Sequence, residues 1–389
     1  MNGMHWISFT TDLNNLSVKK ILVLGGTGAM GGYLVDILSG GNQCLIDVSS
    51  RRDRCTTKRN VTYIKGNARD AVFISTLLQR NYDVIVDFMN YDYDEFADRC
   101  QSLLRATKHY IWFSSCRVYA DSPIPLTETS PRLLETSCDE SFLATNRYAL
   151  RKARQEDLLK TSGFNNYTIV RPYITYSSER LQLGIYEKEQ WLWRLLRGKS
   201  IVINKHILDK TTTMTHGQDV ARIIAQCVAN PRVYGQIVQI ASDETMTWRE
   251  VLRMYLDVLR QTDGISPEIY VSDHMESIDL LYEGGYNTIY DRVYNRCFSS
   301  RRVEELLGEK IPYVEMRDGI EACLRTFLAG AREFLTVNPV YEAYQDVLTD
   351  EMLRESDFGD AELFAVYKEA RKSAEDLLNN RKYLERVTL

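Results

Sequence analysis

The stretch KKILVLGGTGAMGGYLVDIL (19–38) places five glycines directly after a run of apolar residues. Glycine loses more backbone entropy on folding than any other residue, so such a cluster lowers stability unless something else requires it. A strand, a glycine turn and a helix together present the unpaired N–H groups of a helix N-terminus to a phosphate. The spacing of Gly25, Gly28 and Gly31 therefore predicts a dinucleotide-binding turn. A glycine turn without a ligand is the alternative.

Short apolar runs alternate with amphipathic stretches of helical length from residue 19 to residue 172. Within the helical stretches the apolar residues recur at intervals of three and four. Nearly continuous apolar strands that alternate with helices are typical of parallel strands covered on both faces. We therefore predict an α/β fold with a doubly wound parallel sheet of the Rossmann type. The strands are expected at 19–25, 43–49, 60–66, 82–88, 109–115 and 166–172, and the helices at 30–39, 69–79, 94–108 and 140–160.

The regular alternation of strands and helices ends near residue 173. On this basis we predict four parts of the chain. They are an N-terminal extension (1–18), a dinucleotide-binding Rossmann domain (19–173) whose sheet is completed by later segments, a smaller mixed α/β substrate lobe interleaved with it (174–330), and a helical C-terminal extension (331–389). Within the lobe we expect helices at 186–197, 217–229, 247–262 and 315–335, and short strands at 235–241 and 268–272.

Composition excludes several classes of function. The chain of 389 residues has a net charge of -5, which disfavours nucleic acid as a partner because phosphate binding needs concentrated positive charge. No apolar run approaches the ~20 residues of a membrane span, and the N-terminus lacks the pattern of a secretory signal. The eight cysteines have no C-x-x-C pair and no spacing typical of a metal site. We expect a cytoplasmic protein without a metal or a membrane contact.

The end of the second strand indicates which dinucleotide is preferred. Enzymes that bind NAD usually carry an acid there, whereas those that bind NADP use an arginine for the 2′-phosphate. The expected position is Ser49, and Ser50, Arg51 and Arg52 follow it. Asp47 lies two positions too early. The sequence therefore favours NADP over NAD, and a solvated basic turn is the alternative.

A second constellation follows the fifth strand. Ser115 ends that strand, and Tyr148 and Lys152 lie four residues apart on one face of a predicted helix. Carbonyl reduction or alcohol oxidation needs a group that exchanges a proton with the substrate oxygen while hydride moves. Tyr148 is the candidate for this group; the Lys152 ammonium would favour its phenolate, and Ser115 would hold the substrate oxygen. A surface tyrosine–lysine pair is the alternative reading.

These residues resemble the extended short-chain dehydrogenase/reductase superfamily of NAD(P)-dependent nucleotide-sugar epimerases, dehydratases and reductases. Four more segments are similar to its pattern: KGNARD (65–70), VRPYITY (170–176), THGQDVARII (215–224), and SSRRVEELLG (299–308), which matches a late helix of the substrate lobe. The resemblance covers about residues 19–330. It implies catalysis by Ser115, Tyr148 and Lys152, and cofactor contacts from Gly25, Thr27, Gly28, Met30, Gly31, Ser49, Ser50, Arg51, Asn67, Ala68, Phe88, Met89, Tyr148, Lys152 and Pro172.

Departures from the family pattern narrow what the resemblance implies. Sugar dehydratases carry an Asp-Glu pair where this chain has Cys116 and Arg117, so we exclude a dehydratase. Members that bind a nucleotide diphosphate often have Asn in the place of Ile174. We expect an epimerase or reductase acting on a sugar-type hydroxyl or ketone, with a nucleotide sugar as the small-molecule substrate. The alternative is a catalytically weak or inactive, dinucleotide-binding regulatory member or an RNA-associated member.

Other polar residues are assigned less specific roles. His216 is expected to be structural, and Asp219 is expected to open a helix by accepting from its backbone N–H groups. Arg180 and Arg292 are candidates for binding substrate phosphates, with surface salt bridges as the alternative. Cys116 is expected to be a buried, inert thiol. As is common in this superfamily, we expect a homodimer in which helices near 93–108 and 141–160 pair across a two-fold axis.

Overall fold

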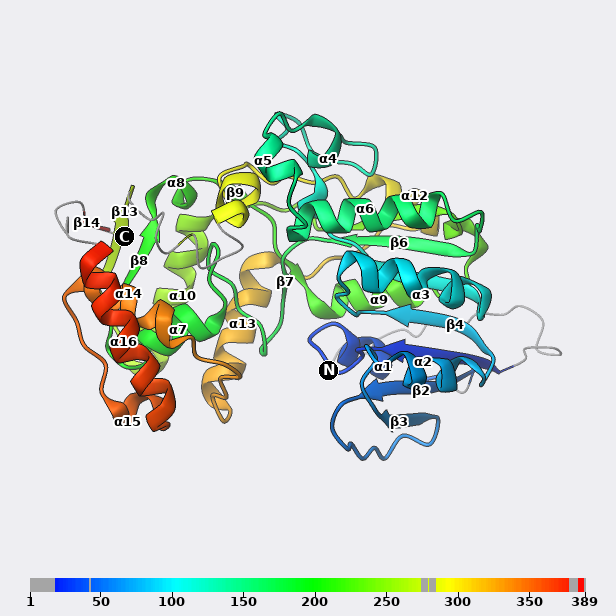
Figure 1. The fold of residues 1–389 in the computed structure, drawn as a ribbon, viewed down its shortest axis with the longest axis horizontal. Coiled ribbons are helices and arrows are strands. Elements are labelled where there is room, and N and C mark those ends of the chain that lie inside the picture. Colours follow the sequence, from blue (N-terminus) through cyan, green and yellow to red (C-terminus); the bar gives the residue numbers. More distant parts are fainter. Residues whose placement is uncertain (1–17, 42, 274–278, 280–284, 378–383, 388–389) are drawn as a thin grey trace, which may run out of the picture.

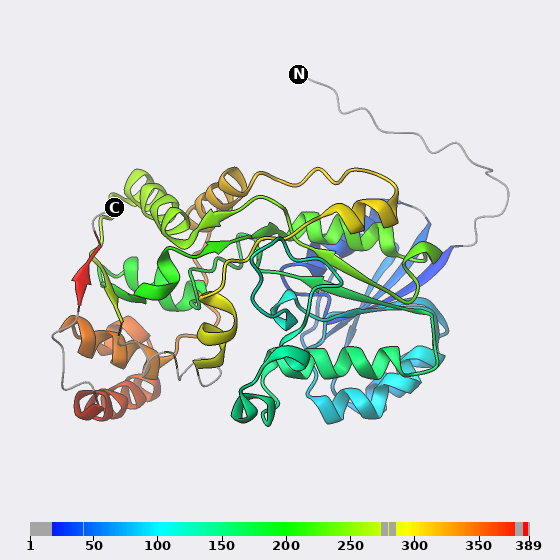
Figure 2. The ribbon, with the colours of Figure 1, turned by 90° about the horizontal axis from the view of Figure 1, so that it is seen from above.

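The computed structural model describes residues 18–41, 43–273, 279, 285–377 and 384–387. Two units lie side by side along the longest axis of the molecule (Figure 1). One is built around a parallel sheet, and the other contains smaller sheets, several helices and the C-terminal segments (Figure 2). The predicted N-terminal extension lies outside the described residues, apart from Val18.

The main sheet has seven parallel strands in the order β11-β6-β5-β4-β1-β2-β3. This confirms the predicted doubly wound sheet and all six of its expected strands. The seventh strand comes from the stretch predicted at 235–241, so a segment far along the chain does complete the sheet. The strands are β1 (Lys19–Leu24), β2 (Cys44–Ser50), β3 (Val61–Lys65), β4 (Tyr82–Asp87), β5 (Thr107–Phe113), β6 (Tyr167–Pro172) and β11 (Gln236–Ile240).

Helices cover both faces of this sheet, each with its own apolar core. The first face is covered by α1 (Gly31–Ser39), α9 (Gly217–Cys227) and α12 (Arg301–Leu307), and the second by α2 (Ala71–Leu78), α3 (Tyr93–Arg105) and α6 (Tyr148–Lys160). The prediction that 299–308 supplies a helix of the substrate lobe is wrong in its location. Val303 and Leu306 of α12 are buried with the residues of the main sheet, because α12 packs against β11.

The single helix predicted at 140–160 is two helices, α5 (Glu140–Leu143) and α6. The side chain of Asp139 accepts from the Phe142 N–H at 3.0 Å and so opens α5. After α5, the hydroxyl of Thr145 accepts from the Arg147 N–H at 3.3 Å, a local bond that competes with continuation of the helix. The break makes Tyr148 the first residue of α6.

The second unit surrounds the largest apolar core of the described residues. Its sheets are short: β7 pairs with β10, β9 with β12, and β8 with β13. The elements are β7 (Thr175–Tyr176), α7 (Lys188–Leu195), β8 (Ile201–Asn204), α8 (Lys205–Leu208), β9 (Thr211–Thr212), β10 (Thr215–His216), β12 (Met246–Thr247), α10 (Trp248–Asp263), β13 (Ile269–Ser272), a π-helical turn (Thr288–Arg292) and α13 (Met316–Ala329). A short α4 (Leu133–Thr136) precedes α5.

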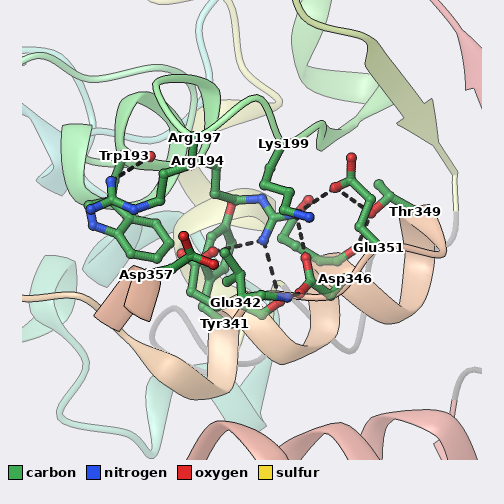
Figure 3. Close-up of polar contacts among 12 residues, drawn as sticks. Trp193, Arg194, Arg197, Lys199, Tyr341, Glu342, Asp346, Thr349, Glu351 and Asp357 are labelled. Atoms are coloured by element: carbon green, nitrogen blue, oxygen red, sulfur yellow. Dashed lines mark hydrogen bonds and ion pairs between the residues drawn. The ribbon is translucent and has the colours of Figure 1, made fainter. Parts of the chain in front are cut away.

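The C-terminal extension is helical, as predicted, and packs tightly on this second unit. It comprises α14 (Pro339–Thr349), α15 (Glu355–Phe358), α16 (Ala361–Leu377) and β14 (Glu385–Arg386), which pairs antiparallel with β13. The guanidinium of Arg194 on α7 donates to Glu342 and Asp346 of α14, both at 2.8 Å, and to Glu351 at 3.0 Å (Figure 3). These four residues form the Arg194 cluster. Because charge-assisted bonds of this kind are strong, they fix α14 against α7.

No helix in the described ranges combines the length and the apolar character needed to cross a membrane. Nor do three or more His, Cys, Asp or Glu side chains gather as metal ligands within those ranges.

Candidate active site

The glycine turn between β1 and α1 has the geometry that its sequence predicts. Gly25 has φ of +68°, a left-handed conformation that side chains disfavour. A Cβ at Gly31 would lie 2.6 Å from the backbone of Gly26, so only glycine lets the helix approach the turn this closely. A Cβ at Gly28 would meet nothing within 4 Å among the described residues. No side chain caps the first turn of α1; the Gly32 N–H donates to the Gly28 carbonyl at 3.0 Å, which leaves the other N–H groups of the turn for a ligand.

A cavity of about 370 Å³ opens at this turn, and we call it the glycine cavity. The carboxyl ends of β2, β3 and β4 form its other walls, next to the point where the strand order reverses between β1 and β4. Ligands of doubly wound sheets bind at such a switch point. Ten residues predicted to bind the cofactor line this cavity, and they are Gly25, Thr27, Gly28, Ser49, Ser50, Arg51, Asn67, Ala68, Phe88 and Met89.

The end of β2 forms part of the wall of the glycine cavity. Ser49 Oγ accepts from the Gly25 N–H at 3.1 Å, which ties the strand end to the glycine turn. Arg51 is exposed at the rim of the glycine cavity. Asp47 is held away from it, because its carboxylate accepts from the Tyr82 hydroxyl at 2.6 Å and from Arg80 at 3.2 Å. No acid of β2 therefore lines the cavity.

A second cavity of about 350 Å³ adjoins the first, and we call it the tyrosine cavity. Phe88 and Asn90, which follow β4, line both cavities. The three predicted catalytic residues line the tyrosine cavity, and so do two predicted cofactor contacts; these five are Ser115, Tyr148, Lys152, Met30 and Pro172. Of the predicted site residues only Gly31 lines neither cavity, because it is buried beneath the turn.

Hydrogen bonds to backbone groups fix the side chains of Ser115 and Lys152 in the wall of the tyrosine cavity. Ser115 is 6% exposed, and its Oγ accepts from the Arg117 N–H at 3.2 Å. Lys152 is buried; its Nζ donates to the Phe113 carbonyl at 2.7 Å. Burial lowers the pKa of Lys152 to about 7, and the nearby carboxylate of Asp87 opposes this effect.

Three basic side chains lie near the Tyr148 ring. The guanidinium carbon of Arg117 lies 4.8 Å from the ring centroid, that of Arg151 5.8 Å, and Lys152 Nζ 5.9 Å. Tyr148 itself is half-buried and faces the tyrosine cavity. Positive charge fixed in this way stabilises negative charge that develops on a phenol or substrate oxygen during reaction. The arrangement is therefore suited to proton exchange with a bound hydroxyl or ketone.

Two arginines considered as phosphate ligands also line the tyrosine cavity. Arg180 Nη2 donates to Glu187 at 2.8 Å, and both residues belong to the wall. Arg292 is buried, donates to the Gly184 carbonyl at 2.8 Å and pairs with Asp291. Burial lowers the pKa of Arg292, and the positive charge of Arg117 adds to that effect. Arg292 therefore belongs to a buried ion pair and not to a surface salt bridge.

The predicted helix-opening role of Asp219 is wrong, and His216 takes it instead. His216 Nδ1 accepts from the Gln218 N–H at 3.1 Å at the start of α9. The Asp219 carboxylate accepts from the Val314 N–H at 2.7 Å, so it binds a later segment to α9. Cys116 is fully buried and its thiol donates to the Arg171 carbonyl; burial raises the pKa of this thiol, which makes it a poor nucleophile, as predicted.

The sequence reading missed Arg117, Gln182 and Asn287 as parts of the wall. Arg117 had a signal, because it lies two residues after Ser115 at the end of a strand. Gln182 lies in an irregular segment and Asn287 in a helical turn directly before the π-helical turn, and no motif marks either of them.

The model of the NAD dependent epimerase/dehydratase family matches residues 21–241, which include the glycine turn, Ser115, Tyr148 and Lys152. The chain belongs to this family. The extended short-chain dehydrogenase/reductase type recognised in the sequence is thereby confirmed.

Other similarities are more distant. The chain is 25% identical over 247 residues to the chloroplast stem-loop binding protein of 41 kDa b of Arabidopsis thaliana, and the match covers 60% of this chain and 61%, or less than two thirds, of that relative. Among solved structures, WbmH of Bordetella bronchiseptica in complex with NAD+ superposes with a TM-score of 0.60, at 16% identity over 80% of this chain and 98% of that chain. The UDP-N-acetylglucosamine 4-epimerase of Methanobrevibacter ruminantium gives a TM-score of 0.60, at 16% identity over 80% and 99%. At this identity the two structures show the shared fold.

Proposed function

We propose that this family member is an NAD(P)-dependent epimerase or reductase that acts on a hydroxyl or ketone of a nucleotide-linked sugar. The observation that carries the proposal is the junction of the two cavities at Phe88 and Asn90. A dinucleotide whose phosphates lie at the glycine turn reaches past β4 toward the cavity that contains Ser115, Tyr148 and Lys152.

The residues present fit a nicotinamide dinucleotide. The uncapped first turn of α1 and the open side of Gly28 would hold the pyrophosphate, and Asn67 and Ala68 would border the adenine. When bound, the dinucleotide supplies the hydride acceptor and donor. Tyr148 exchanges a proton with the substrate oxygen, and Ser115 holds that oxygen by a hydrogen bond. Lys152 supplies positive charge near the Tyr148 ring.

NADP is the preferred form in this proposal. Arg51 at the rim is placed to pair with a 2′-phosphate, and no acid of β2 is placed to bond a free ribose hydroxyl. The structural neighbours support a nicotinamide dinucleotide and a nucleotide sugar in general, since WbmH is in complex with NAD+ and the Methanobrevibacter epimerase with UDP-N-acetylmuramic acid.

Titration of the purified protein with NADPH and NADH, followed by nicotinamide fluorescence, tests the proposal. We expect saturable binding of both, with NADPH tighter. Addition of candidate sugars then separates the two reactions: a reductase oxidises the nicotinamide in proportion to product, whereas an epimerase forms product without net oxidation. Failure to bind either dinucleotide contradicts the proposal.

A specific observation favours a second candidate function, the binding of RNA. The Arabidopsis relative is named a stem-loop binding protein. In addition, the loop that leads from the glycine cavity at Arg51 to the start of β3 contains four exposed arginines, which are Arg51, Arg52, Arg54 and Arg59. Binding of a stem-loop RNA that weakens steeply with salt, and that Arg52→Gln and Arg54→Gln together reduce, would establish this function.

We also propose a homodimer, in which α3 and α6 pair with their counterparts. The two helices pack side by side on one face of the sheet unit (Figure 2). Light scattering tests this proposal, because a mass near 45 kDa rather than twice that value rules it out.

A further inference from the structure

A fully buried carboxylate lies behind the tyrosine cavity, and the proposed reaction gives it no role of its own. Glu156 is 0% exposed and lies on α6, one helical turn after Lys152. Residues four apart share one face of a helix, and both of these side chains reach the carboxyl end of β5. A buried charge is unfavourable unless it is paired and hydrogen-bonded, so the partners of Glu156 indicate why it is there.

Glu156 links α6 to the end of β5. Its Oε1 accepts from the hydroxyl of Ser114 at 2.6 Å. Ser114 lies between two residues of the site: the Phe113 carbonyl accepts from Lys152 Nζ, and Ser115 is the residue proposed to hold the substrate oxygen. Two successive residues at this strand end, directly before Ser115, are therefore hydrogen-bonded to α6.

Glu156 also links α6 to the end of β6. The Arg171 guanidinium donates to Glu156 from Nε at 2.7 Å and from Nη2 at 2.5 Å, the bidentate geometry that arginine forms with a carboxylate. Arg171 is 1% exposed and directly precedes Pro172, which lines the tyrosine cavity. One carboxylate thus accepts three hydrogen bonds from the ends of two neighbouring strands.

These contacts keep Glu156 ionised at neutral pH. Burial opposes ionisation, but the charge of Arg171 and the hydrogen bonds from Arg171 and Ser114 lower the pKa of Glu156 below its usual value. A further hydrogen bond comes from Arg132 Nη1 at 3.0 Å. Arg132 directly precedes α4, a segment that contains none of the proposed site residues. The carboxylate therefore has partners that lead into the site and one that does not.

From these contacts we propose that Glu156 is a positioning residue of the active site. The proposal rests on the proposed function and deepens it. Glu156 lines neither cavity and touches no ligand; it fixes the ends of β5 and β6 against α6 and so sets the spacing between Ser115 and Tyr148. Groups of a site must be held within about 0.5 Å of the productive geometry by such supporting contacts. The nicotinamide half of a dinucleotide depends on this spacing, whereas the adenine half lies in the glycine cavity.

A comparison of two ligands tests the proposal without a known sugar. NADPH would occupy both cavities, whereas adenosine 2′,5′-bisphosphate lacks the nicotinamide half and reads the glycine cavity alone. Glu156→Gln keeps the shape of the side chain and removes its charge. It should weaken the binding of NADPH by about 10-fold and that of adenosine 2′,5′-bisphosphate by less than about 2-fold, as measured by calorimetry on the full chain. Equal effects on the two ligands, or no effect on either, overturn the proposal.

Two further variants separate position from stability. Ser114→Ala removes only the link to β5 and should weaken NADPH binding by about 3-fold, so it decides the matter if Glu156→Gln does not fold. Arg132→Gln is the matched control, because it removes another charged partner of the same carboxylate. It should lower Tm and keep both affinities. A thermal melt verifies that each variant is folded. Affinities that follow Tm, whichever partner is removed, would show that Glu156 is merely structural.

Measurement of the unaltered chain comes first and distinguishes failure of this inference from failure of the proposed function. Absence of NADPH binding contradicts the proposed function, and this inference with it. NADPH binding that neither Glu156→Gln nor Ser114→Ala weakens contradicts the positioning role alone.

Discussion

Two charge clusters lie in the second unit and beside it, and they are opposite in composition. The Arg194 cluster has one guanidinium and three carboxylates (Figure 3). Among the described residues that line the tyrosine cavity there are three arginines and one glutamate. The first is closed between α7 and α14, where Arg194, Glu342 and Asp346 are fully buried. The second opens onto a space large enough for a ligand.

The two clusters differ in whether their buried groups can change their charge by binding or releasing a proton. Burial raises the pKa of Glu342 to about 8, so this carboxyl keeps its proton at neutral pH. The proton reduces the excess of negative charge in the Arg194 cluster. An arginine side chain cannot lose its proton in this range, so the arginines of the tyrosine cavity keep their positive charge at neutral pH. The first cluster stabilises the fold, and the second is suited to bind a ligand.

The largest expected effect concerns chemistry in the tyrosine cavity. Tyr148→Phe removes the proton-exchanging hydroxyl and should reduce kcat by about 10²- to 10⁴-fold without lowering the melting temperature. Steady-state kinetics together with a thermal melt provide the test. Tyr93→Phe, on α3 and outside both cavities, is the control and should keep full activity. Full activity of Tyr148→Phe would contradict the assignment of the proton-exchanging group.

The next largest effect is expected when the Arg194 cluster is broken. Arg194→Met leaves the Asp346 and Glu351 carboxylates and the Glu342 carboxyl group without their cation and should lower the free energy of unfolding by about 3–5 kcal/mol. Urea denaturation measures the loss. Arg301→Met, which breaks an exposed pair with Glu305, should change stability by less than about 1 kcal/mol. Equal losses in the two variants would show that the Arg194 cluster does not hold α14 in place.

A smaller effect follows from the proton on Glu342. Its pKa is raised on folding from the usual value near 4.5 to about 8, so the folded state holds the proton more tightly. This contribution to stability is complete below pH 4.5 and is lost as pH rises through 8, with a slope of up to about 1.4 kcal/mol per pH unit. Denaturation between pH 5 and 9 should show the decline, and Glu342→Gln should flatten it. An unchanged slope in the variant contradicts the assignment to Glu342.

The smallest expected effect concerns the pKa of the buried Lys152. Lys152 has a pKa lowered to about 7 by burial; Asp87 and Glu156 oppose the shift and Arg151 adds to it. Removing the negative charge with Asp87→Asn should lower the pKa of Lys152 further and move the alkaline limb of the pH–rate profile down by about one pH unit. Asp83→Asn, at the other end of β4, should leave the profile in place. An alkaline limb that does not move in Asp87→Asn would show that Lys152 does not set it.

Local signals in the sequence were sufficient for the sheet and for the residues of the glycine turn, and they selected three candidate catalytic residues that line one cavity. Gly25 and Gly31 are glycines because the backbone at each position excludes a side chain, and this requirement is visible in the glycine spacing. Tyr148 and Lys152 share a helical face by their spacing alone. The break that separates α5 from α6 depends on two side-chain bonds, those of Asp139 and Thr145, which helical periodicity does not reveal.

Interactions between distant segments could not be predicted in this way. Arg194 and Glu342 are separated by 148 positions, so the periodicity of α14 predicts a helix but does not identify its partner. Gln182 and Asn287 enter the tyrosine cavity from different segments of the second unit, and only the folded structure brings them together. The full set of polar groups in that cavity therefore emerged only from the structure.

The pairing of β14 with β13 has a practical consequence for handling the protein. β13 lies between β8 and β14, so its hydrogen-bonding groups are occupied on both sides. A shortened chain that stops before α16 would remove β14 and uncover one side of β13, a ready template for another strand. Recombinant versions that omit the last segments are expected to self-associate, and purification tags are better placed at the opposite terminus.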